Sequence, residues 1–395
     1  MRICFVAPFG YPVLAGSRSV KVVGGAEVQQ SFIARELARR GHEVSMISMD
    51  YGQREGERVH EVRVLKMCAP DAGLPVLRFL HPRLTSLWSA MKRADADVYY
   101  QRASGALTGF VAAFTRRHDR RMVFAGAHDF DFEPHLPLVA YRRDKALYRH
   151  GLARADQVVV QSERQLQRCR EVFGREALRI RSCYGHQGQP ARQEGTVLWA
   201  ASVKPIKRPE LFLDLAERLP QFRFKLIGGP GAGSDHFESL RSRAASLPNV
   251  EMTGFVPHVD VEAHFDGASV FVNTAVSEGF PNTFLQAWSR GMPTVSFFDP
   301  GTRLDGEPVG VVVPDLDAMV QAVQRLKTDT AQWRREGERS AEYLRRHHGV
   351  GAIVDEYERI FERLTARSAG APEQASEGGR QSVLEGPSGG GGVQR

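Results

Sequence analysis

The first 48 residues of the chain constrain its fold more than any other feature. Residues 2–7 form an apolar run that predicts a strand, and a glycine-bearing loop, Gly10 to Gly25, follows it. Glu27 to Arg40 is amphipathic and ends at Gly41, which is typical of a helix closed by a glycine. Val44 to Ser48 predicts the next strand. A strand, a glycine loop, a helix and a second strand make a βαβ unit, so the chain opens as part of a parallel sheet.

The same alternation continues in two series. In the first half, the further apolar runs that predict strands are residues 62–65, 98–101, 122–125 and 158–161. The second series predicts strands at residues 197–201, 222–227, 250–253, 270–273, 294–298 and 309–313, with amphipathic stretches between them. Strands that alternate with helices predict an α/β protein, and a chain of 395 residues is long enough for two such domains.

Composition places the boundaries between these parts. Residues 185–195 are rich in Gly, Gln and Pro and predict a linker between a first domain, residues 1–184, and a second domain, residues 196–348. Residues 349–366 hold a last amphipathic helix. Residues 367–395 are rich in Gly, Ser, Glu and Gln with no aromatic residue, so we expect a disordered tail.

The net charge of +7 is spread unevenly. Residues 1–180 carry 29 Lys and Arg against 19 Asp and Glu, whereas the remaining residues carry 24 against 27. A basic first half favours an anionic partner, such as a membrane surface, an anionic lipid-linked acceptor or nucleic acid. The alternative is a solvated basic face that keeps the protein in solution. Nucleic acid is the weakest of these because the basic segments lack interleaved aromatic motifs.

Nothing in the sequence predicts export or a membrane span. No stretch reaches the roughly 18 apolar residues that a spanning helix needs. The N-terminal apolar run is too short for a signal segment. The four cysteines are scattered without a close pair, which argues against a disulfide framework or a zinc site and fits the cytoplasm.

The most informative stretch is residues 277–295. An apolar strand run, residues 269–273, precedes it; a Gly-Phe-Pro-Asn turn follows, and then a short helix from Thr283 to Arg290. Glu278 lies just after the strand, and Gln286 lies eight residues on, inside the helix. The carboxyl ends of parallel strands build ligand sites, so two polar groups placed this way could hold two parts of an extended ligand.

With this stretch, the linker and the two halves, the chain resembles the family 4 glycosyltransferases over about residues 1–365. These are retaining enzymes of the GT-B architecture, in which two facing Rossmann-like domains enclose the active site and a C-terminal helix returns to the first domain. The resemblance implies that Glu278 contacts the hydroxyls of a donor sugar, helped by the backbone amides of Gly279 and Phe280.

The resemblance also assigns the helix that follows Glu278. The turn formed by Pro281, Asn282 and Thr283 would meet the donor phosphates, because the free N–H groups and dipole of a helix start favour anions. The family places a second Glu at position 286, where it holds the nucleotide ribose. Gln286 can still donate and accept hydrogen bonds but carries no charge, and we expect its exchange for Glu to be tolerated.

A second matching segment is Ser202 to Pro209, after the strand at residues 197–201. The family places an Arg and, five residues on, a Lys against the leaving diphosphate, which gains charge in the transition state. Lys207 matches the Lys, Ser202 stands where the Arg is expected, and Lys204 compensates from two residues on. The alternative is a solvent-exposed basic loop.

Two short loops complete the donor side of the resemblance. Residues 228–234 resemble the family's glycine loop beside the donor, which places Gly229 there. Residues 254–257 resemble the loop beside the nucleobase, which places Val256 there. Neither loop is specific by itself.

The first half matches the family in fewer places. Gly24 and Gly25 resemble the Gly-Gly-x-Glu turn, whose glycines let the backbone approach the donor. His128 follows a predicted strand where the family often has a histidine near the reacting carbon; the alternative is a loop histidine bonded to backbone. The family's Asn-Gly-Val is absent, and Tyr184, Gly185 and His186 stand in its place.

The sequence predicts no metal and no cofactor apart from the nucleotide-diphospho-sugar donor. Three Asp-x-Asp triplets, which could hold the metal of another class of transferase, begin at Asp95, Asp129 and Asp315. Three such triplets in one chain show how little the pattern specifies. In the GT-B architecture, cationic side chains stabilise the leaving group instead.

The combined expectation is a retaining, metal-independent hexosyltransferase. It would move a sugar to a glycan or lipid-linked acceptor in bacterial surface polysaccharide synthesis, at the inner face of the cytoplasmic membrane. Two alternatives remain open: a sugar-nucleotide epimerase of the same architecture, and a catalytically silent binding or scaffold protein.

Overall fold

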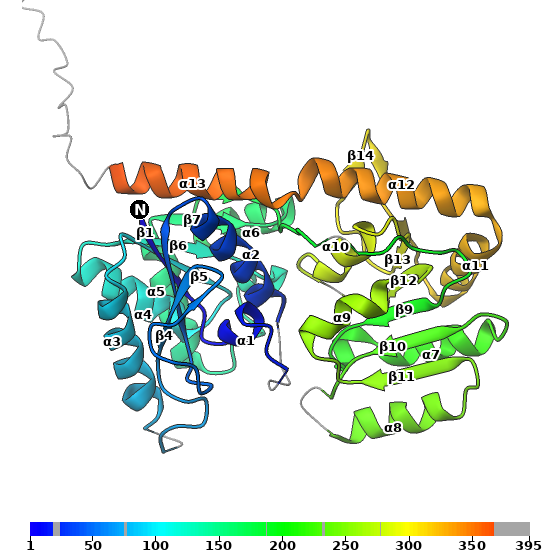
Figure 1. Cartoon of the computed structure of the whole chain (residues 1–395), viewed down its shortest axis with the longest axis horizontal. Helices are drawn as coiled ribbons and strands as arrows, with labels where there is room; N and C mark the ends of the chain where they lie inside the picture. The colour runs from blue at the N-terminus through cyan, green and yellow to red at the C-terminus, as the bar shows by residue number, and fades with distance from the viewer. Residues whose placement is uncertain (19–23, 75–76, 187, 231–233, 277, 367–395) are drawn as a thin grey trace, which may run out of the picture.

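The computed structural model describes residues 1–18, 24–74, 77–186, 188–230, 234–276 and 278–366. Figure 1 shows two α/β domains side by side, with two long helices, α12 and α13, running along one edge of both. The predicted disorder of residues 367–395 concerns residues outside those described.

The first domain is built on an eight-stranded sheet in the order β3-β4-β2-β1-β5-β6-β7-β8. Every neighbouring pair is parallel except the short β3–β4 hairpin. The strands are β1 (Arg2–Val6), β2 (Glu43–Ser48), β3 (Arg58–Val59), β4 (Val62–Lys66), β5 (Val98–Arg102), β6 (Arg121–Ala125), β7 (Gln157–Val160) and β8 (Ala177–Arg179). The helices are α1 (Tyr11–Leu14), α2 (Gly25–Arg39), η1 (Phe79–Leu84), α3 (Thr85–Ala94), α4 (Ala106–Arg117), η2 (Asp129–Phe132), α5 (Arg142–Arg154) and α6 (Glu163–Phe173).

The central strand β1 explains why this sheet is parallel and covered on both faces. Cys4 and Val6 belong to one hydrophobic core, whereas Ile3 and Phe5 belong to the core on the opposite face. Since successive side chains of a strand point to opposite faces, an unbroken apolar run needs helices on both sides.

The second domain is built on a fully parallel six-stranded sheet in the order β11-β10-β9-β12-β13-β16. Its strands, with a small separate hairpin β14–β15, are β9 (Val197–Ala200), β10 (Phe224–Ile227), β11 (Val250–Gly254), β12 (Val270–Asn273), β13 (Thr294–Ser296), β14 (Arg303–Leu304), β15 (Glu307–Pro308) and β16 (Val311–Val312). Its helices are η3 (Pro205–Lys207), α7 (Pro209–Arg218), α8 (Ser234–Ala245), α9 (His258–Phe265), α10 (Asn282–Trp288), α11 (Leu316–Thr328) and α12 (Thr330–His347), and the last helix of the chain is α13 (Val350–Ala366).

The predicted fold class, two α/β domains with parallel sheets, is confirmed. The apolar runs placed the main strands to within about two residues, and β8 is the strand of the first sheet's parallel series that they missed. β8 lies at the edge of the sheet and its Leu178 is 39% exposed, so it carries no continuous apolar run.

Helix α13 returns to the first domain, as expected, and completes its core. Six of its side chains are buried there together with Ile3 and Phe5 of β1; they are Ile353, Val354, Tyr357, Ile360, Phe361 and Leu364. Arg40 at the end of α2 donates to Asp355 (2.6 Å) and Glu358 (2.5 Å) of α13. The first domain therefore depends on the end of the chain for part of its hydrophobic core.

The crossing from the second domain to α13 passes through a buried histidine. His348 is 1% exposed, and its Nδ1 lies 2.5 Å from the carbonyl oxygen of Ser182 in the first domain. Its own carbonyl accepts from the backbone N–H of Tyr184 (2.9 Å), and its ring stacks on Phe280 at 5.1 Å between centroids. Burial lowers the pKa of His348 to about 3.

Removing a buried ring from α13 should destabilise the first domain. We expect Phe361→Ala, which empties a fully buried site, to lower the free energy of unfolding by about 3–5 kcal/mol. Denaturant titration followed by circular dichroism measures this. Glu362→Ala, an exposed neighbour on the same helix, is the control and should change little. Equal effects of the two substitutions would show that α13 does not contribute to the core.

The stability of the protein should fall in acid in a way that depends on His348. Because its folded pKa is about 3 and its usual pKa is 6.5, the unfolded chain takes up the proton first as the pH falls below 6.5. The contribution is fully present above 6.5 and is lost toward the folded pKa, at about 1.4 kcal/mol per pH unit.

His348→Asn isolates this contribution, because Asn keeps a donor for the Ser182 carbonyl and does not titrate in this range. The difference in unfolding free energy between wild type and variant, measured across this range, should shrink as the pH falls. A difference that stays constant with pH would contradict the assignment.

Candidate active site

Turns from the two domains meet at close range. A Cβ atom on Gly279 would lie 2.7 Å from the carbonyl oxygen of Ala127 and 3.0 Å from the Cα of His128, so only glycine permits this approach. Close by, the Asn282 side chain donates to the carbonyl of Gly25 (3.0 Å) and accepts from Gln29 (3.1 Å). The structure therefore brings together the two segments that the sequence analysis placed at the donor, although they lie about 250 residues apart.

Glu278 and Lys207 form the charged centre of this boundary. The Glu278 carboxylate accepts from Lys207 Nζ and from Asn273 Nδ2 (3.5 Å), and both charged side chains are at most 19% exposed. Asn273 ends β12, and its Oδ1 accepts from the backbone N–H of Ala275 (2.9 Å). The carbonyl of Lys207 accepts from Thr274 Oγ1 (2.7 Å). The strand end therefore fixes both members of the ion pair.

Asn273 and Thr274 were missed by the sequence analysis. The signal that could have found them is a pair of polar residues directly after a buried strand. Arg208 was also given no role; it adopts a left-handed backbone (φ 45°) and donates through Nε to the carbonyl of Thr274 (2.8 Å). This guanidinium holds the turn between Lys207 and α7 against the end of β12.

The other donor-side residues lie around the same turn. Ser202 and Lys204 are exposed. The backbone N–H of Val203, between them, donates to the carbonyl of Gly229 (3.0 Å). A Cβ on Gly229 would come within 2.7 Å of the Cβ of Phe255, which precedes Val256. The four predicted positions are thus neighbours in space.

His128 caps the short helix η2 in the first domain. Its Nδ1 accepts from the backbone N–H of Phe130 (3.1 Å), so the neutral ring carries its proton on Nε2. Burial lowers the pKa of His128 and keeps the ring neutral near pH 7, although the Glu278 carboxylate acts in the opposite direction. The backbone bond expected of a loop histidine is therefore present, and it leaves a hydrogen-bond donor on the other nitrogen.

Asp131 holds the His128 turn in place. One of its carboxylate oxygens accepts from the backbone N–H groups of Ala127 (2.7 Å) and His128 (3.0 Å), and the other accepts from Ser104 Oγ (2.6 Å). A buried carboxylate with several backbone donors fixes the loop geometry at the domain boundary.

Gln286 lies in a buried polar cluster. It is 5% exposed, and its Nε2 donates to Glu262 Oε1 (2.8 Å). The other Glu262 oxygen accepts from the hydroxyl of Tyr184 (2.7 Å), at the end of the first domain. The fully buried Arg290 guanidinium pairs with Glu262 (3.0 Å) and Asp266 (2.7 Å). The negative charge that the family places at position 286 is thus supplied in this cluster by Glu262, which the sequence analysis did not single out.

The carboxylates of the Asp-x-Asp triplets are engaged in contacts within the protein. Their partners are Arg2 for Asp95 and Asp97, Gln165 for Asp129, backbone N–H groups for Asp131 and Asp315, and Arg218 for Asp317. In the part of the chain that the structure describes, no group of three or more His, Cys, Asp and Glu side chains is arranged to hold a metal. A metal-independent reaction stays a prediction.

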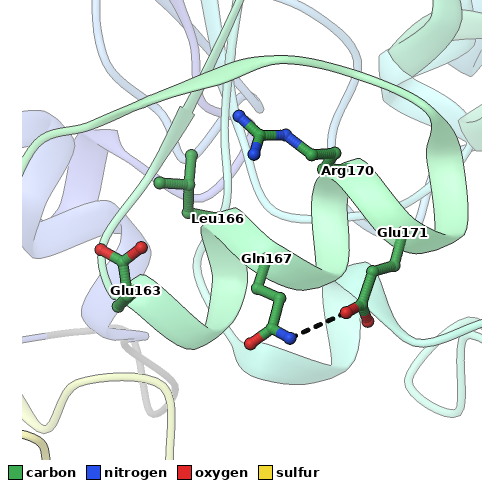
Figure 2. Close-up of a pocket in the computed structure, with 5 residues that line it drawn as sticks. All are labelled: Glu163, Leu166, Gln167, Arg170 and Glu171. Carbon is green, nitrogen blue, oxygen red and sulfur yellow. Dashed lines mark hydrogen bonds between the residues drawn. The ribbon is translucent and has the colours of Figure 1, made fainter.

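A shallow surface depression on α6 lies outside this boundary. Figure 2 shows that its labelled residues all come from one helix, with Gln167 donating to Glu171 (2.8 Å). Its Arg170 is already paired with Glu176 (2.7 Å). A single helix face with satisfied charges offers no converging groups for a ligand.

Known sequence families match both halves of the chain. The family described as Glycosyltransferase Family 4 matches residues 23–184, and the family described as Glycosyl transferases group 1 matches residues 194–329. One phosphatidylinositol N-acetylglucosaminyltransferase protein from Arabidopsis thaliana is 32% identical over 123 residues, which cover 29% of this chain and 26% of the plant protein. Three of the curated relatives that match are covered to only 26–43% of their own length.

Solved structures match nearly the whole chain. Sucrose-phosphate synthase from Thermosynechococcus elongatus aligns over 92% of this chain and 99% of its own, with a TM-score of 0.75 at 19% identity. HepE from Anabaena, solved with UDP-glucose, aligns over 91% and 99%, with a TM-score of 0.65 at 14% identity. These similarities support the GT-B fold. With both halves matched in order, the chain belongs to the glycosyl transferases group 1, with a Glycosyltransferase Family 4 domain preceding the group 1 domain.

Proposed function

We propose that this protein transfers a sugar from a nucleotide-diphospho-sugar to an acceptor hydroxyl and retains the anomeric configuration. The observation that carries the proposal is the Lys207–Glu278 pair of the second domain, which lies at the boundary where Gly279 touches the His128 turn of the first. A cation, a carboxylate and a neutral imidazole from two domains converge there.

The proposed chemistry uses each of these groups once. The acceptor oxygen forms a bond to the anomeric carbon as the bond from that carbon to the diphosphate breaks, and the acceptor proton passes to the departing phosphate oxygen. Lys207 and the exposed Lys204 stabilise the negative charge that develops on the diphosphate. Glu278 accepts hydrogen bonds from the sugar hydroxyls, and Nε2 of His128 donates one. No step of this scheme uses a metal.

We propose a glycan or lipid-linked acceptor in bacterial surface polysaccharide synthesis. The basic first half favours an anionic partner, and the Arabidopsis relative is named for a phospholipid acceptor. No helix among the described residues is long and apolar enough to cross a membrane. A cytoplasmic protein that contacts the anionic inner face of the membrane satisfies these observations.

Removing the Glu278 charge should stop turnover without unfolding the protein. Across a panel of UDP-, GDP- and ADP-sugars, we expect the wild type to turn over at least one donor and Glu278→Gln to be slower by about 100-fold. The control Glu307→Gln changes an exposed carboxylate in the β14–β15 hairpin and should keep the wild-type rate. Turnover of none of the donors, or a wild-type rate in Glu278→Gln, would refute the proposal. Release of an epimerised donor with no acceptor present would identify an epimerase instead.

The contact with Glu262 reverses the effect expected for Gln286→Glu. A second carboxylate at hydrogen-bond distance from Glu262 should lower the free energy of unfolding by about 1–3 kcal/mol near neutral pH. Because repulsion raises the pKa of the introduced carboxyl in the folded state, the penalty is full at high pH and shrinks as the pH falls through that raised pKa.

Denaturant titrations at about pH 8 and about pH 5 measure this change. The control Gln286→Met loses the same hydrogen bond without adding a charge, so its penalty should not depend on pH. A Gln286→Glu variant that is as stable as wild type at both pH values would show that Glu262 does not constrain the position.

A further inference from the structure

The first domain contains a cavity of about 340 Å³ that the donor-side residues do not line. It lies at the carboxyl ends of β1, β2, β4 and β5, with helices η1 and α4 beside it. Its wall is mostly apolar and includes Val6, Met49, Met67, Phe79, Leu107 and Phe110. Cavities of this kind at the carboxyl edge of a parallel sheet take small ligands.

Two arginines in the wall lack carboxylate partners. Arg102 is 7% exposed and makes one hydrogen bond, from Nη1 to the hydroxyl of Tyr100 (3.3 Å), while its Nε has no partner in the described part of the protein. Arg83 donates to the carbonyl of Pro70 (3.2 Å), and its Nε is likewise unpartnered among the described residues. A buried guanidinium without an anion is costly, because burial removes its hydration.

The two carboxylates in the wall are engaged elsewhere. Asp144 accepts from Arg143 Nε (2.9 Å). Glu27 accepts from backbone N–H groups at the start of its own helix; burial raises its pKa, and the nearby charge of Arg102 only partly opposes this. Among the described residues, neither Arg83 nor Arg102 forms an ion pair with them. The cavity thus holds two positive charges without carboxylate partners.

A third polar group also lacks a partner. Gln30 lies on α2, is 2% exposed, and its Oε1 accepts no hydrogen bond from the described residues. A ligand hydroxyl that enters the cavity could donate to this oxygen. The unsatisfied groups therefore comprise two cationic donors and one neutral acceptor.

The cavity lies beside the proposed reacting face. Ser104 lines it and donates through Oγ to Asp131 (2.6 Å), and Asp131 in turn accepts from the backbone N–H of His128 (3.0 Å). A ligand in the cavity is therefore separated from the His128 turn by a single carboxylate. This position suits the second substrate of a transfer reaction.

We infer that the cavity binds an acceptor that carries a phosphate ester beside an apolar group. The phosphate pairs with the guanidinium groups of Arg102 and Arg83, a hydroxyl donates to Gln30, and the apolar group lies against the side chains around Phe79 and Phe110. Two unpaired cations match the nearly double charge of a phosphate monoester better than the single charge of a carboxylate. This inference rests on the proposed transfer reaction, since it names the acceptor of that reaction.

Binding of phosphate compounds by the full chain, without any nucleotide sugar, tests the inference. By calorimetry, phenyl phosphate should bind the wild type, and benzyl alcohol, which has the ring without the charge, should bind at least about tenfold more weakly. Arg102→Met should weaken phenyl phosphate binding by at least about tenfold and leave benzyl alcohol unchanged. Arg116→Met, an exposed arginine on α4, is the matched control and should bind as wild type.

Two further arms separate the sources of the phosphate. Dihexanoyl phosphatidylglycerol, used below its micelle concentration, presents the phosphate as a lipid headgroup, whereas phenyl phosphate presents it as a soluble ester. Tighter, Arg102-dependent binding of either one supports the site and identifies the source. If Arg102→Met does not fold, Arg83→Met and Arg102→Lys should each show a partial loss.

Binding that is the same in wild type and all three arginine variants would overturn the inference, as would equal affinity for phenyl phosphate and benzyl alcohol. A parallel titration with UDP keeps this result apart from the proposed function. A protein that turns over a donor but ignores phosphate esters refutes only the acceptor assignment. A protein that binds phenyl phosphate through Arg102 but turns over no donor refutes the transfer reaction and leaves the phosphate site.

Discussion

The carboxylate of Glu262 joins the two domains, and much of the candidate site depends on it. It accepts from Tyr184 at the end of the first domain and from Gln286 in the helix that follows the donor turn. It also pairs with Arg290, whose guanidinium is fully buried. Without this carboxylate, Arg290 would keep one ionic partner in place of two, and a buried charge without compensation is costly. The orientation of α10, and with it the turn that begins at Glu278, follows from this cluster.

The two halves of the proposed site handle charge differently. In the second domain, Lys207 and Glu278 neutralise each other, and the end of β12 holds both in position. In the first domain, Arg102 and Arg83 have no carboxylate partner among the described residues. A paired cation stays in place until a ligand competes for it, whereas an unpaired buried cation already favours an anion. The same chain can therefore hold a donor by exchange of partners and an acceptor by supplying a missing one.

Close backbone approaches set the distance between these halves. Gly279 and Gly25 each lie where a Cβ would meet an atom of the opposite domain within 2.7 Å. Larger residues at either position would separate Glu278 from the His128 turn. The return of α13 acts in the same direction, because its buried side chains complete the first domain's core while α12 stays with the second.

The sequence by itself determined the order of the elements and the main polar groups of the site. Apolar runs such as residues 2–7 and 270–273 mark buried strands because a parallel strand is covered on both faces, and the motifs around Glu278, Lys207 and His128 are local. Only the tertiary structure decided which partners these groups have. The residues that contact one another here, such as Asn282 with Gln29 or Gln286 with Glu262, lie on different elements, and no local pattern records such a contact. The unpaired state of Arg102 is likewise a property of the folded cavity, since it depends on where every nearby carboxylate has been placed.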